Sequence, residues 1–362
     1  MKYRKICMLL IGCMLLAGCG TAEQTATTET GSAASSTQQT TQTAQSDEPV
    51  TQEVFAMDTY MTVTAYGEHA QQGVEKAVEE IERLDALLSI GKETSEIAKL
   101  NETGSAVLSD DTAALVDEAL ELYQSTDGAY DITVLPLMEL WGFTTQNYKM
   151  PTQQELSDTL KLVGADKLNW DTDSKTLTLG EGQSIDLGGI AKGYTSGRIM
   201  EIFAENGVTS GMVSLGGNVQ LLGTKTDGSN WKVGIQDPNN SEEMLGVLET
   251  ANRAVITSGG YERYFEQDGK TYHHILDPKD GQPAESGLIS VTIVSENGTL
   301  ADGLSTSLFV MGKEKALDYW RSHADEFDAI LMEADGTVTV TDGIADSFTL
   351  SSGETPEIAA RS

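Results

Sequence analysis

The stretch Asp186-Leu187-Gly188-Gly189-Ile190-Ala191-Lys192-Gly193-Tyr194 combines an acid, paired glycines and a lysine where a helix is predicted to begin. Glycines let the backbone approach a ligand closely, and the first turn of a helix attracts anions. Lys192 can balance the charge of a phosphate group. The alternative is an ordinary turn into a helix with a lysine at the surface, and this stretch alone does not separate the two.

Three further motifs follow in the chain: Thr257-Ser258-Gly259-Gly260, His274-Ile275-Leu276-Asp277-Pro278 and Asp302-Gly303-Leu304-Ser305-Thr306. Each places an acid, a hydroxyl or a histidine on glycine-rich or helix-starting backbone. Together with the first stretch they supply the groups needed to handle a magnesium-bound pyrophosphate. We therefore favour an enzyme that acts on a nucleotide-like substrate.

Asp302 and Thr306 lie four residues apart at the start of a helix predicted over 300–311, so their side chains share one face. A carboxylate and a hydroxyl are hard oxygen ligands suited to Mg²⁺, with water and phosphate completing the octahedron. Spacing alone favours a structural role, in which the helix dipole stabilises Asp302 in the first turn and Thr306 is buried packing.

His274 is one of only four histidines in the chain. A histidine that titrates near neutral pH can take a proton from an attacking hydroxyl. The alternative is a half-buried histidine in a strand. The segment Trp141-Gly142-Phe143 is interpreted as core rather than as a stacking site for a ring.

The N-terminus resembles a bacterial lipoprotein signal. A basic segment (2–5) precedes an apolar run (6–17) that is too short to span a bilayer, and Leu16-Ala17-Gly18-Cys19 follows. We expect residues 1–18 to be removed, Cys19 to be lipidated, and the exported protein to be anchored to the outer face of the cell membrane. The alternative is an ordinary secretory signal with an accidental cysteine.

The other two cysteines lie inside the signal, so the mature chain would keep only Cys19. A disulfide framework, a thiolate metal site and a cysteine nucleophile are therefore excluded. Residues 19–50 are rich in Thr, Ser, Gln and Ala and are predicted to form a disordered tether. With residues 350–362 expected to be a flexible tail, residues 51–349 remain for one large domain, or two packed lobes.

The formal net charge is −33, which argues against nucleic-acid binding because so acidic a chain repels phosphate backbones. The same charge makes a cation more necessary wherever an anionic substrate binds.

Hydrophobic periodicity predicts mixed helices and strands. Strands are expected over 54–66, 168–170, 176–179, 211–214, 220–223, 231–236, 254–256 and 288–294, and a later hairpin is expected to turn at 334–336. Helices are expected over 74–88, after a Ser109 cap, after a capping box at Thr152, and over 300–311 and 313–322. Because strands and helices do not strictly alternate, the predicted class is α+β rather than a doubly wound parallel sheet.

With these residues in place, the chain resembles the FAD:protein FMN transferases, the ApbE family, over roughly Val54 to Thr349. The motifs that carry the resemblance, besides the four already quoted, are Gly128-Ala129-Tyr130-Asp131-Ile132-Thr133-Val134, Leu140-Trp141-Gly142-Phe143, Leu215-Gly216-Gly217-Asn218, Trp231-Lys232-Val233-Gly234-Ile235, Asp237-Pro238, Tyr261-Glu262-Arg263, Gly281-x-Pro283 and Ala301. The resemblance implies a single α+β flavin transferase domain of mixed sheets with packed helices. It implies that the enzyme splits the pyrophosphate of FAD, joins FMN by a phosphoester to a Thr or Ser hydroxyl of an acceptor protein, and releases AMP. The implied acceptor is a membrane redox subunit.

By position, the resemblance assigns Mg²⁺ to Gly189 (through its carbonyl), Asp302, Ser305 and Thr306, and FAD to Met57, Gly91, Ala129, Tyr130, Asp131, Asp186, Lys192 and Ile275. His274 is the expected general base. Two departures stand out: the family's usual Met-Gly-Thr is Met57-Asp58-Thr59 here, and Gly91 stands where many members carry an aromatic residue. Two other functions remain open at this point, namely hydrolysis of FAD to FMN and AMP, and a non-catalytic flavin-binding lipoprotein.

Overall fold

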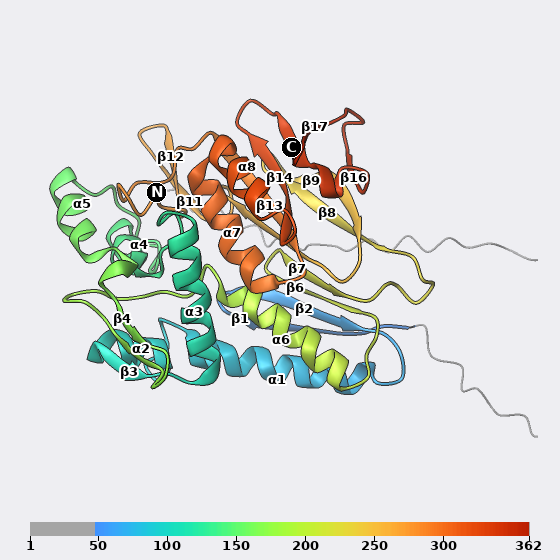
Figure 1. The fold of residues 1–362 in the computed structure, drawn as a ribbon, viewed down its shortest axis with the longest axis horizontal. Coiled ribbons are helices and arrows are strands. Elements are labelled where there is room, and N and C mark those ends of the chain that lie inside the picture. The colour runs from blue at the N-terminus through green and yellow to red at the C-terminus, as the bar shows by residue number, and fades with distance from the viewer. Residues whose placement is uncertain (1–47, 362) are drawn as a thin grey trace, which may run out of the picture. The chain divides into compact units, whose positions relative to one another are not determined.

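The computed structural model describes residues 48–361, which are drawn in colour in Figure 1. The predicted signal peptide, Cys19 and all but the last residues of the predicted tether lie outside this range. Within the described residues, no helix combines the length and the apolar character needed to cross a bilayer.

A nine-stranded sheet forms the centre of the fold, in the order β1-β2-β6-β7-β10-β13-β14-β15-β17. Neighbouring strands are antiparallel except for β15 and β17, which are parallel. The strands are β1 (Val50–Ala56), β2 (Thr59–Ala65), β6 (Gly211–Leu215), β7 (Asn218–Leu222), β10 (Ala254–Gly259), β13 (Leu288–Ser295), β14 (Phe327–Glu333), β15 (Val338–Thr341) and β17 (Glu357–Ala359).

Both faces of this sheet are covered. Helices α1 (Ala70–Leu88), α6 (Ala191–Glu205) and α7 (Gly298–Met311) pack on one face (Figure 1). A three-stranded sheet covers the other face through the apolar side chains of β8 (Trp231–Asp237), β9 (Asn240–Thr250) and β16 (Phe348–Leu350). Adjacent residues of a strand point to opposite faces, so Ile293 joins the helical core while Val294 joins the core under β8 and β9.

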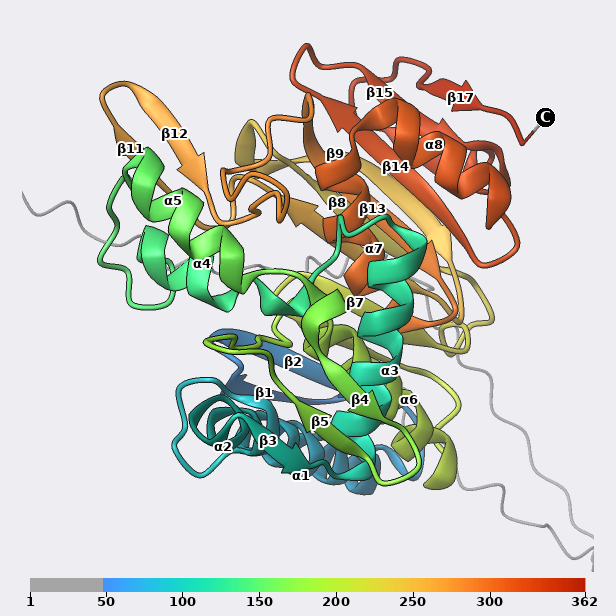
Figure 2. The ribbon, with the colours of Figure 1, turned by 60° about the vertical axis from the view of Figure 1, so that its left-hand side comes forward.

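The remaining elements surround this centre (Figure 2). They are α2 (Glu96–Thr103), β3 (Ser105–Val107), α3 (Asp110–Ser125), α4 (Leu135–Trp141), α5 (Gln153–Thr159), β4 (Asn169–Asp171), β5 (Thr176–Thr178), β11 (Tyr264–Gln267), β12 (Lys270–His273), α8 (Lys313–Ser322) and the short 3₁₀ turns Ile132–Val134, Leu160–Leu162, Ala165–Lys167 and Asp342–Ile344. The predicted α+β class is confirmed. The caps are confirmed too, because the Ser109 hydroxyl accepts from the N–H of Thr112 and Thr152 forms a complete capping box with Glu155.

The segment predicted as one strand over 54–66 is a hairpin. Met57 and Asp58 form its turn, with φ angles of 48° and 58°. Two consecutive left-handed residues make the tight turn that suits the twist of a hairpin, and Asp tolerates this conformation better than most residues. The single-strand prediction was wrong because the apolar alternation continues through the turn.

The end of the chain was expected to be a flexible tail, and this expectation was wrong for residues 357–359. These residues form β17, whose Ile358 pairs with Val340 in β15. The Lys313 ammonium also contacts the Glu357 carboxylate at 2.8 Å. The polar sequence before β17 gives no strand pattern. The strand has only three residues and is stabilised by its contacts with β15 and Lys313.

Candidate active site

The site begins with a close crossing of α6 and α7. A Cβ atom on Gly193 would lie only 2.2 Å from the carbonyl oxygen of Gly298, and one on Gly298 would lie 2.7 Å from the carbonyl oxygen of Gly193. Neither position can carry a side chain, so the two helices touch through their backbones. This contact brings Asp302 of α7 against the first turn of α6.

Asp302 is buried, with 4% of its surface exposed. One carboxylate oxygen accepts a hydrogen bond from the Gly193 N–H at 2.8 Å, and the other accepts from the side-chain amide of Asn218 at 2.9 Å. The N-cap residue of α6, Ile190, has no side-chain cap of its own, so Asp302 closes that helix end from another element. Burial raises the pKa of Asp302, and the nearby Lys192 opposes this shift.

Three hydroxyl groups gather beside Asp302. The Ser258 hydroxyl at the end of β10 lies 2.7 Å from the Ser305 hydroxyl and 3.3 Å from the Thr306 hydroxyl. Ser305 also donates to the backbone carbonyl of Asp302 at 2.8 Å. The face shared by Asp302 and Thr306 was predicted from their spacing, whereas Ser258 was not placed there.

This donor set fits Mg²⁺. In the part of the chain that the structure describes, no three His, Cys, Asp or Glu side chains group together as a metal site. Mg²⁺ is usually held by one or two carboxylates and completed by substrate phosphates and water. One buried carboxylate with three neighbouring hydroxyls matches that pattern.

Gly189 faces Tyr130. A Cβ atom on Gly189 would lie 3.3 Å from a ring carbon of Tyr130 and 3.4 Å from its hydroxyl. Burial raises the pKa of Tyr130, and the carboxylates of Asp302 and Asp186 act in the same direction. The structure therefore brings together four of the predicted site residues, which are Gly189, Tyr130, Asp186 and Asp302. The buried Ala129 precedes Tyr130 in the chain.

Asp186 connects this group to the β1–β2 hairpin. Its carboxylate accepts from the Gly188 N–H at 2.8 Å. Burial raises the pKa of Asp186, Arg263 and Lys192 oppose the shift, and Asp58 adds to it. The hairpin turn therefore lies within electrostatic range of Asp186.

Asp85 joins the two regions where the chain departs from the family pattern. It accepts from the N–H of Met57 at 3.1 Å and from the ammonium of Lys92 at 2.6 Å. The exposed loop that contains Gly91 is thereby held to the hairpin turn. Gly91 itself donates its N–H to the Ser89 hydroxyl at 3.1 Å.

The side chain of Asp131 is committed to the fold. It accepts from the N–H and hydroxyl of Thr133 at 2.8 and 2.6 Å and from the N–H of Ala165 at 3.2 Å. It thus caps the 3₁₀ turn Ile132–Val134. The carboxylate of Asp131 therefore stabilises the fold, and only the backbone groups near Asp131 take no part in this capping.

His274 is oriented by the backbone. Its Nδ1 lies 3.1 Å from the carbonyl oxygen of Arg263, so Nδ1 carries the proton and donates, and Nε2 is left as an acceptor. Burial lowers the pKa of His274 well below its ordinary value of 6.5, and Arg263 and Lys192 push in the same direction. His274 is therefore neutral at neutral pH. The neighbouring Ile275 is 5% exposed and packs in the core.

Lys192 is the common neighbour of these groups. Its charge acts on the four titratable side chains Asp186, Glu262, Asp302 and His274. Lys192 can supply positive charge to a pyrophosphate, and the three acids around it make a further cation necessary there, while the neutral imidazole can accept a proton.

Asn218, Ser258, Glu262 and Arg263 belong to the same cluster but were not assigned a site role from the sequence. All four fall inside motifs that carry the family resemblance, so the signal was present. What was missing was the partner of each residue: Asp302 for Asn218, the hydroxyls of Ser305 and Thr306 for Ser258, the charge of Lys192 for Glu262, and the ring of His274 for the Arg263 carbonyl.

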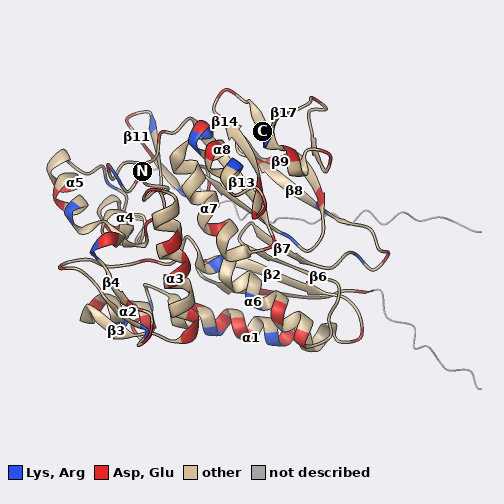
Figure 3. Cartoon of the chain, viewed as in Figure 1, with Lys and Arg blue, Asp and Glu red and all other residues tan. Residues whose placement is uncertain are grey.

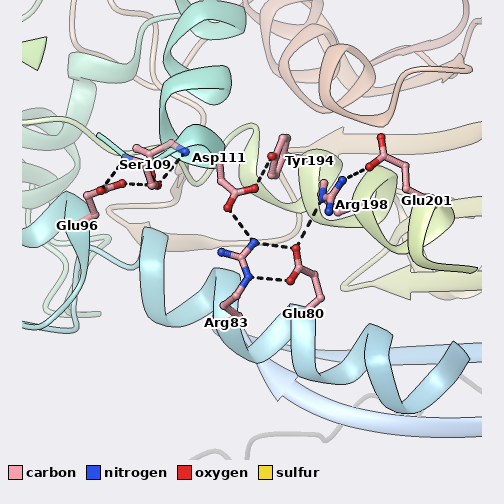
Figure 4. Close-up of polar contacts among 9 residues, drawn as sticks. Glu80, Arg83, Glu96, Ser109, Asp111, Tyr194, Arg198 and Glu201 are labelled. Carbon is pink, nitrogen blue, oxygen red and sulfur yellow. Dashed lines mark hydrogen bonds and ion pairs between the residues drawn. The ribbon is translucent and has the colours of Figure 1, made fainter. Parts of the chain in front are cut away.

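An ion-pair network holds α6 in place (Figure 4). Arg83 of α1 contacts Glu80 at 2.7 Å and Asp111 of α3 at 2.8 Å. The Tyr194 hydroxyl of α6 donates to Asp111 at 2.7 Å, and Arg198 of α6 lies 3.7 Å from Glu80. Tyr194 of the opening motif therefore anchors the helix. Figure 3 shows other acidic residues along α1 and α3, in line with the negative net charge.

Comparison with known proteins identifies the family. Residues 57–331 match the ApbE family model. The FAD:protein FMN transferase of Haemophilus influenzae is 33% identical over 268 residues, covering 71% of this chain and 77% of that protein. The enzyme of the same name from Vibrio cholerae is 33% identical over 243 residues, covering 66% and 72%.

Comparison with solved structures supports the same family. The ApbE protein of Thermotoga maritima superimposes with a TM-score of 0.78 at 32% identity, covering 83% of this chain and 99% of that one. The flavin transferase ApbE of Vibrio cholerae gives a TM-score of 0.75 at 27% identity, with the same coverage. The chain therefore belongs to the ApbE family and is an enzyme of the FAD:protein FMN transferase type.

Proposed function

We propose that this enzyme, in the presence of Mg²⁺, transfers FMN from FAD to a Thr or Ser hydroxyl of an acceptor protein and releases AMP. The observation that carries the proposal is the charge of Lys192, which acts both on the buried carboxylate of Asp302 and on the neutral imidazole of His274. The names of the relatives support FAD and a protein as the two substrates.

The site residues supply most of the required chemistry. Lys192 and Arg263 provide positive charge for the pyrophosphate, and the backbone at Gly188 and Gly189 leaves room for close approach. Asp302, Thr306, Ser305 and the carbonyl of Gly189 would hold Mg²⁺, which supplies further neutralisation of the charge developing on the phosphate oxygens.

His274 Nε2 is free to take the proton of the acceptor hydroxyl. The hydroxyl oxygen then forms a bond to the phosphorus on the FMN side while the bond from that phosphorus to the bridging oxygen breaks. The bridging oxygen leaves with AMP. The proton held by His274 returns to AMP or to solvent, so atoms and charge balance.

A direct test incubates the purified protein with FAD and Mg²⁺, with and without an acceptor-containing extract from a strain that lacks this gene. Transfer gives a fluorescent, covalently flavinylated protein band together with AMP, and EDTA abolishes both. Free FMN and AMP without a labelled band would instead identify a hydrolase. Unchanged FAD would identify a binding protein.

Location is part of the same proposal. The sequence at Leu16 to Cys19 supports export and a lipid anchor on the outer face of the membrane. Such an anchor would keep the enzyme close to a membrane redox subunit that acts as the acceptor.

A further inference from the structure

An aromatic ladder runs from the core to the surface beside β11 and β12. Tyr148 stacks on Phe265 with ring centroids 5.1 Å apart, and Phe265 stacks on Tyr272 at 5.2 Å. Tyr272 contacts Trp141 at 5.6 Å. Trp141 is only 1% exposed, whereas Tyr148 at the other end is 36% exposed. Figure 2 shows the β11–β12 hairpin beside α4 and α5, where the ladder lies.

The loop that presents Tyr148 is fixed. Gly142 has a φ angle of 81°, and a Cβ atom there would lie 2.1 Å from the carbonyl oxygen of Asn147. The Lys149 N–H donates to the Trp141 carbonyl at 3.2 Å, which closes the loop. Trp141 is itself anchored, because its ring N–H donates to the Gly281 carbonyl at 2.8 Å. A preformed loop loses little conformational entropy when a partner binds.

This exposed end adjoins the catalytic histidine. The ring of Phe143 contacts Tyr148 at 5.5 Å and His274 at 6.4 Å. Met150, two residues beyond Tyr148, is 45% exposed. We call Tyr148, Met150 and Phe265 the aromatic platform. It places apolar surface one side chain away from the group expected to take the proton.

We infer that the aromatic platform is the docking surface for the acceptor polypeptide. This inference rests on the proposed function, in which a Thr or Ser hydroxyl must reach His274 Nε2. The partner that fits is an extended segment with an apolar or aromatic side chain close to the reacting Thr or Ser. Rigid exposed aromatic rings are the side chains that most often dominate binding energy at protein interfaces.

A second pair of exposed aromatic residues is an alternative docking surface for the acceptor, so the two surfaces can be compared by experiment. Phe55 and Tyr60 are 60% and 64% exposed, and their rings contact each other at 5.1 Å. This pair lies on the β1–β2 hairpin, whose turn is within electrostatic range of Asp186. The acceptor hydroxyl must meet the base, so the platform is the better placed of the two.

The experiment measures flavinylation by in-gel fluorescence, using increasing amounts of membrane extract from a strain that lacks this gene as the acceptor source. The variants are Tyr148→Ser, Tyr148→Phe, Phe55→Ser and Val107→Ser. Val107, on β3, is 69% exposed and serves as the matched control for removing exposed apolar surface. FAD affinity and melting temperature are measured on each protein.

Tyr148→Ser should raise the extract concentration for half-maximal labelling by about tenfold or more, the usual effect of removing an aromatic anchor. Its rate at saturation and its FAD affinity should change less than about twofold. Tyr148→Phe, which keeps the ring, should behave as wild type, and so should Phe55→Ser and Val107→Ser. The same extract tested with wild type keeps the two proposals separate, because absence of labelling there refutes the proposed function itself.

Three results would overturn the inference while labelling by wild type persists. Unchanged half-saturation in Tyr148→Ser would show that the platform does not bind the acceptor. A matching loss of FAD affinity would show that it binds the flavin instead. A larger effect of Phe55→Ser would move the docking surface to the β1–β2 hairpin.

Discussion

The carboxylate of Asp302 accepts a 2.8 Å hydrogen bond from the backbone N–H of Gly193, a residue 109 positions earlier in the chain. The acid expected to hold Mg²⁺ therefore also closes the first turn of the helix that carries Lys192. A substitution at Asp302 consequently acts on stability as well as on activity, and the two effects must be separated.

Replacing Asp302 with Ala should lower both the stability of the protein and its transfer activity. Loss of the carboxylate leaves the Gly193 N–H and the Asn218 amide without their buried partner, which costs about 1–3 kcal/mol of unfolding free energy. Asp302→Asn keeps an oxygen for Gly193, and the Asn218 amide can turn to match it, so its stability should stay near wild type. Its transfer rate should nevertheless fall by about 10²-fold or more, as expected when a buried charge that supports the reaction is removed.

The measurements are urea unfolding and transfer rate against Mg²⁺ concentration. An Asp302→Asn protein with wild-type activity and no change in its Mg²⁺ requirement would rule out the metal assignment.

His274→Asn should separate binding from chemistry. FAD affinity should change little, while FMN transfer should fall by about 10²–10⁴-fold, the usual contribution of a general base. The loss should shrink as pH rises, because hydroxide partly replaces the missing base. Equal losses of FAD affinity, melting temperature and rate would mark His274 as structural, and full transfer activity would remove it from the mechanism.

The lowered pKa of His274 also fixes the pH dependence. The free enzyme keeps the imidazole neutral below its ordinary pKa of 6.5, so kcat/KM should stay flat through pH 6.5 and decline only at lower pH. For stability, the unfolded chain binds the proton more tightly than the folded one. The contribution of His274 is therefore complete above pH 6.5 and is lost as pH falls through the folded value. His274→Asn should lack this loss in melting temperature between pH 6.5 and the folded pKa.

The crossing of α6 and α7 offers a matched pair of glycines. Gly193→Ala places a methyl group 2.2 Å from the Gly298 carbonyl oxygen, so the helices must separate and the unfolding free energy should drop by about 1–3 kcal/mol. A Cβ atom on Gly197, in the same helix, meets nothing within 4 Å. Gly197→Ala should therefore be neutral or stabilise by up to about 1 kcal/mol. Denaturant midpoints compare the two, and equal effects would contradict the crossing.

Cys19→Ser should prevent lipidation and release the protein from membranes without changing the activity of the catalytic domain. Fractionation of cells and transfer assays on the released protein test this. A Cys19→Ser protein that still sediments with membranes would count against the anchor.

The elements with a local signal were predictable from the sequence. The helix over 313–322 has a clear period, and Ser109 and Thr152 carry caps within three residues of the N–H groups that they satisfy. The strand β9 was missed because its first half is exposed and polar, so its pairing with β8 is what makes it a strand.

For the candidate site, too, local features were predictable from the sequence and contacts between distant residues were not. The motif around Lys192 and the spacing of Asp302 and Thr306 pointed to the chemistry before the fold was known. The hydrogen bond from Asn218 to Asp302 joins residues 84 positions apart, and no pattern within either motif encodes it. The commitment of Asp131 to Thr133 was likewise hidden, since the residues of a motif do not reveal whether its acid binds a ligand or stabilises a turn.

The backbone contact between Gly193 and Gly298 makes the site a product of the completed fold. Before α6 and α7 meet, Asp302 and Lys192 are distant charges on a flexible chain, and neither has a partner with which to hold a pyrophosphate. The ability to bind FAD at this place would therefore begin only when the two helices cross, and a partly folded chain would carry the motifs without the activity.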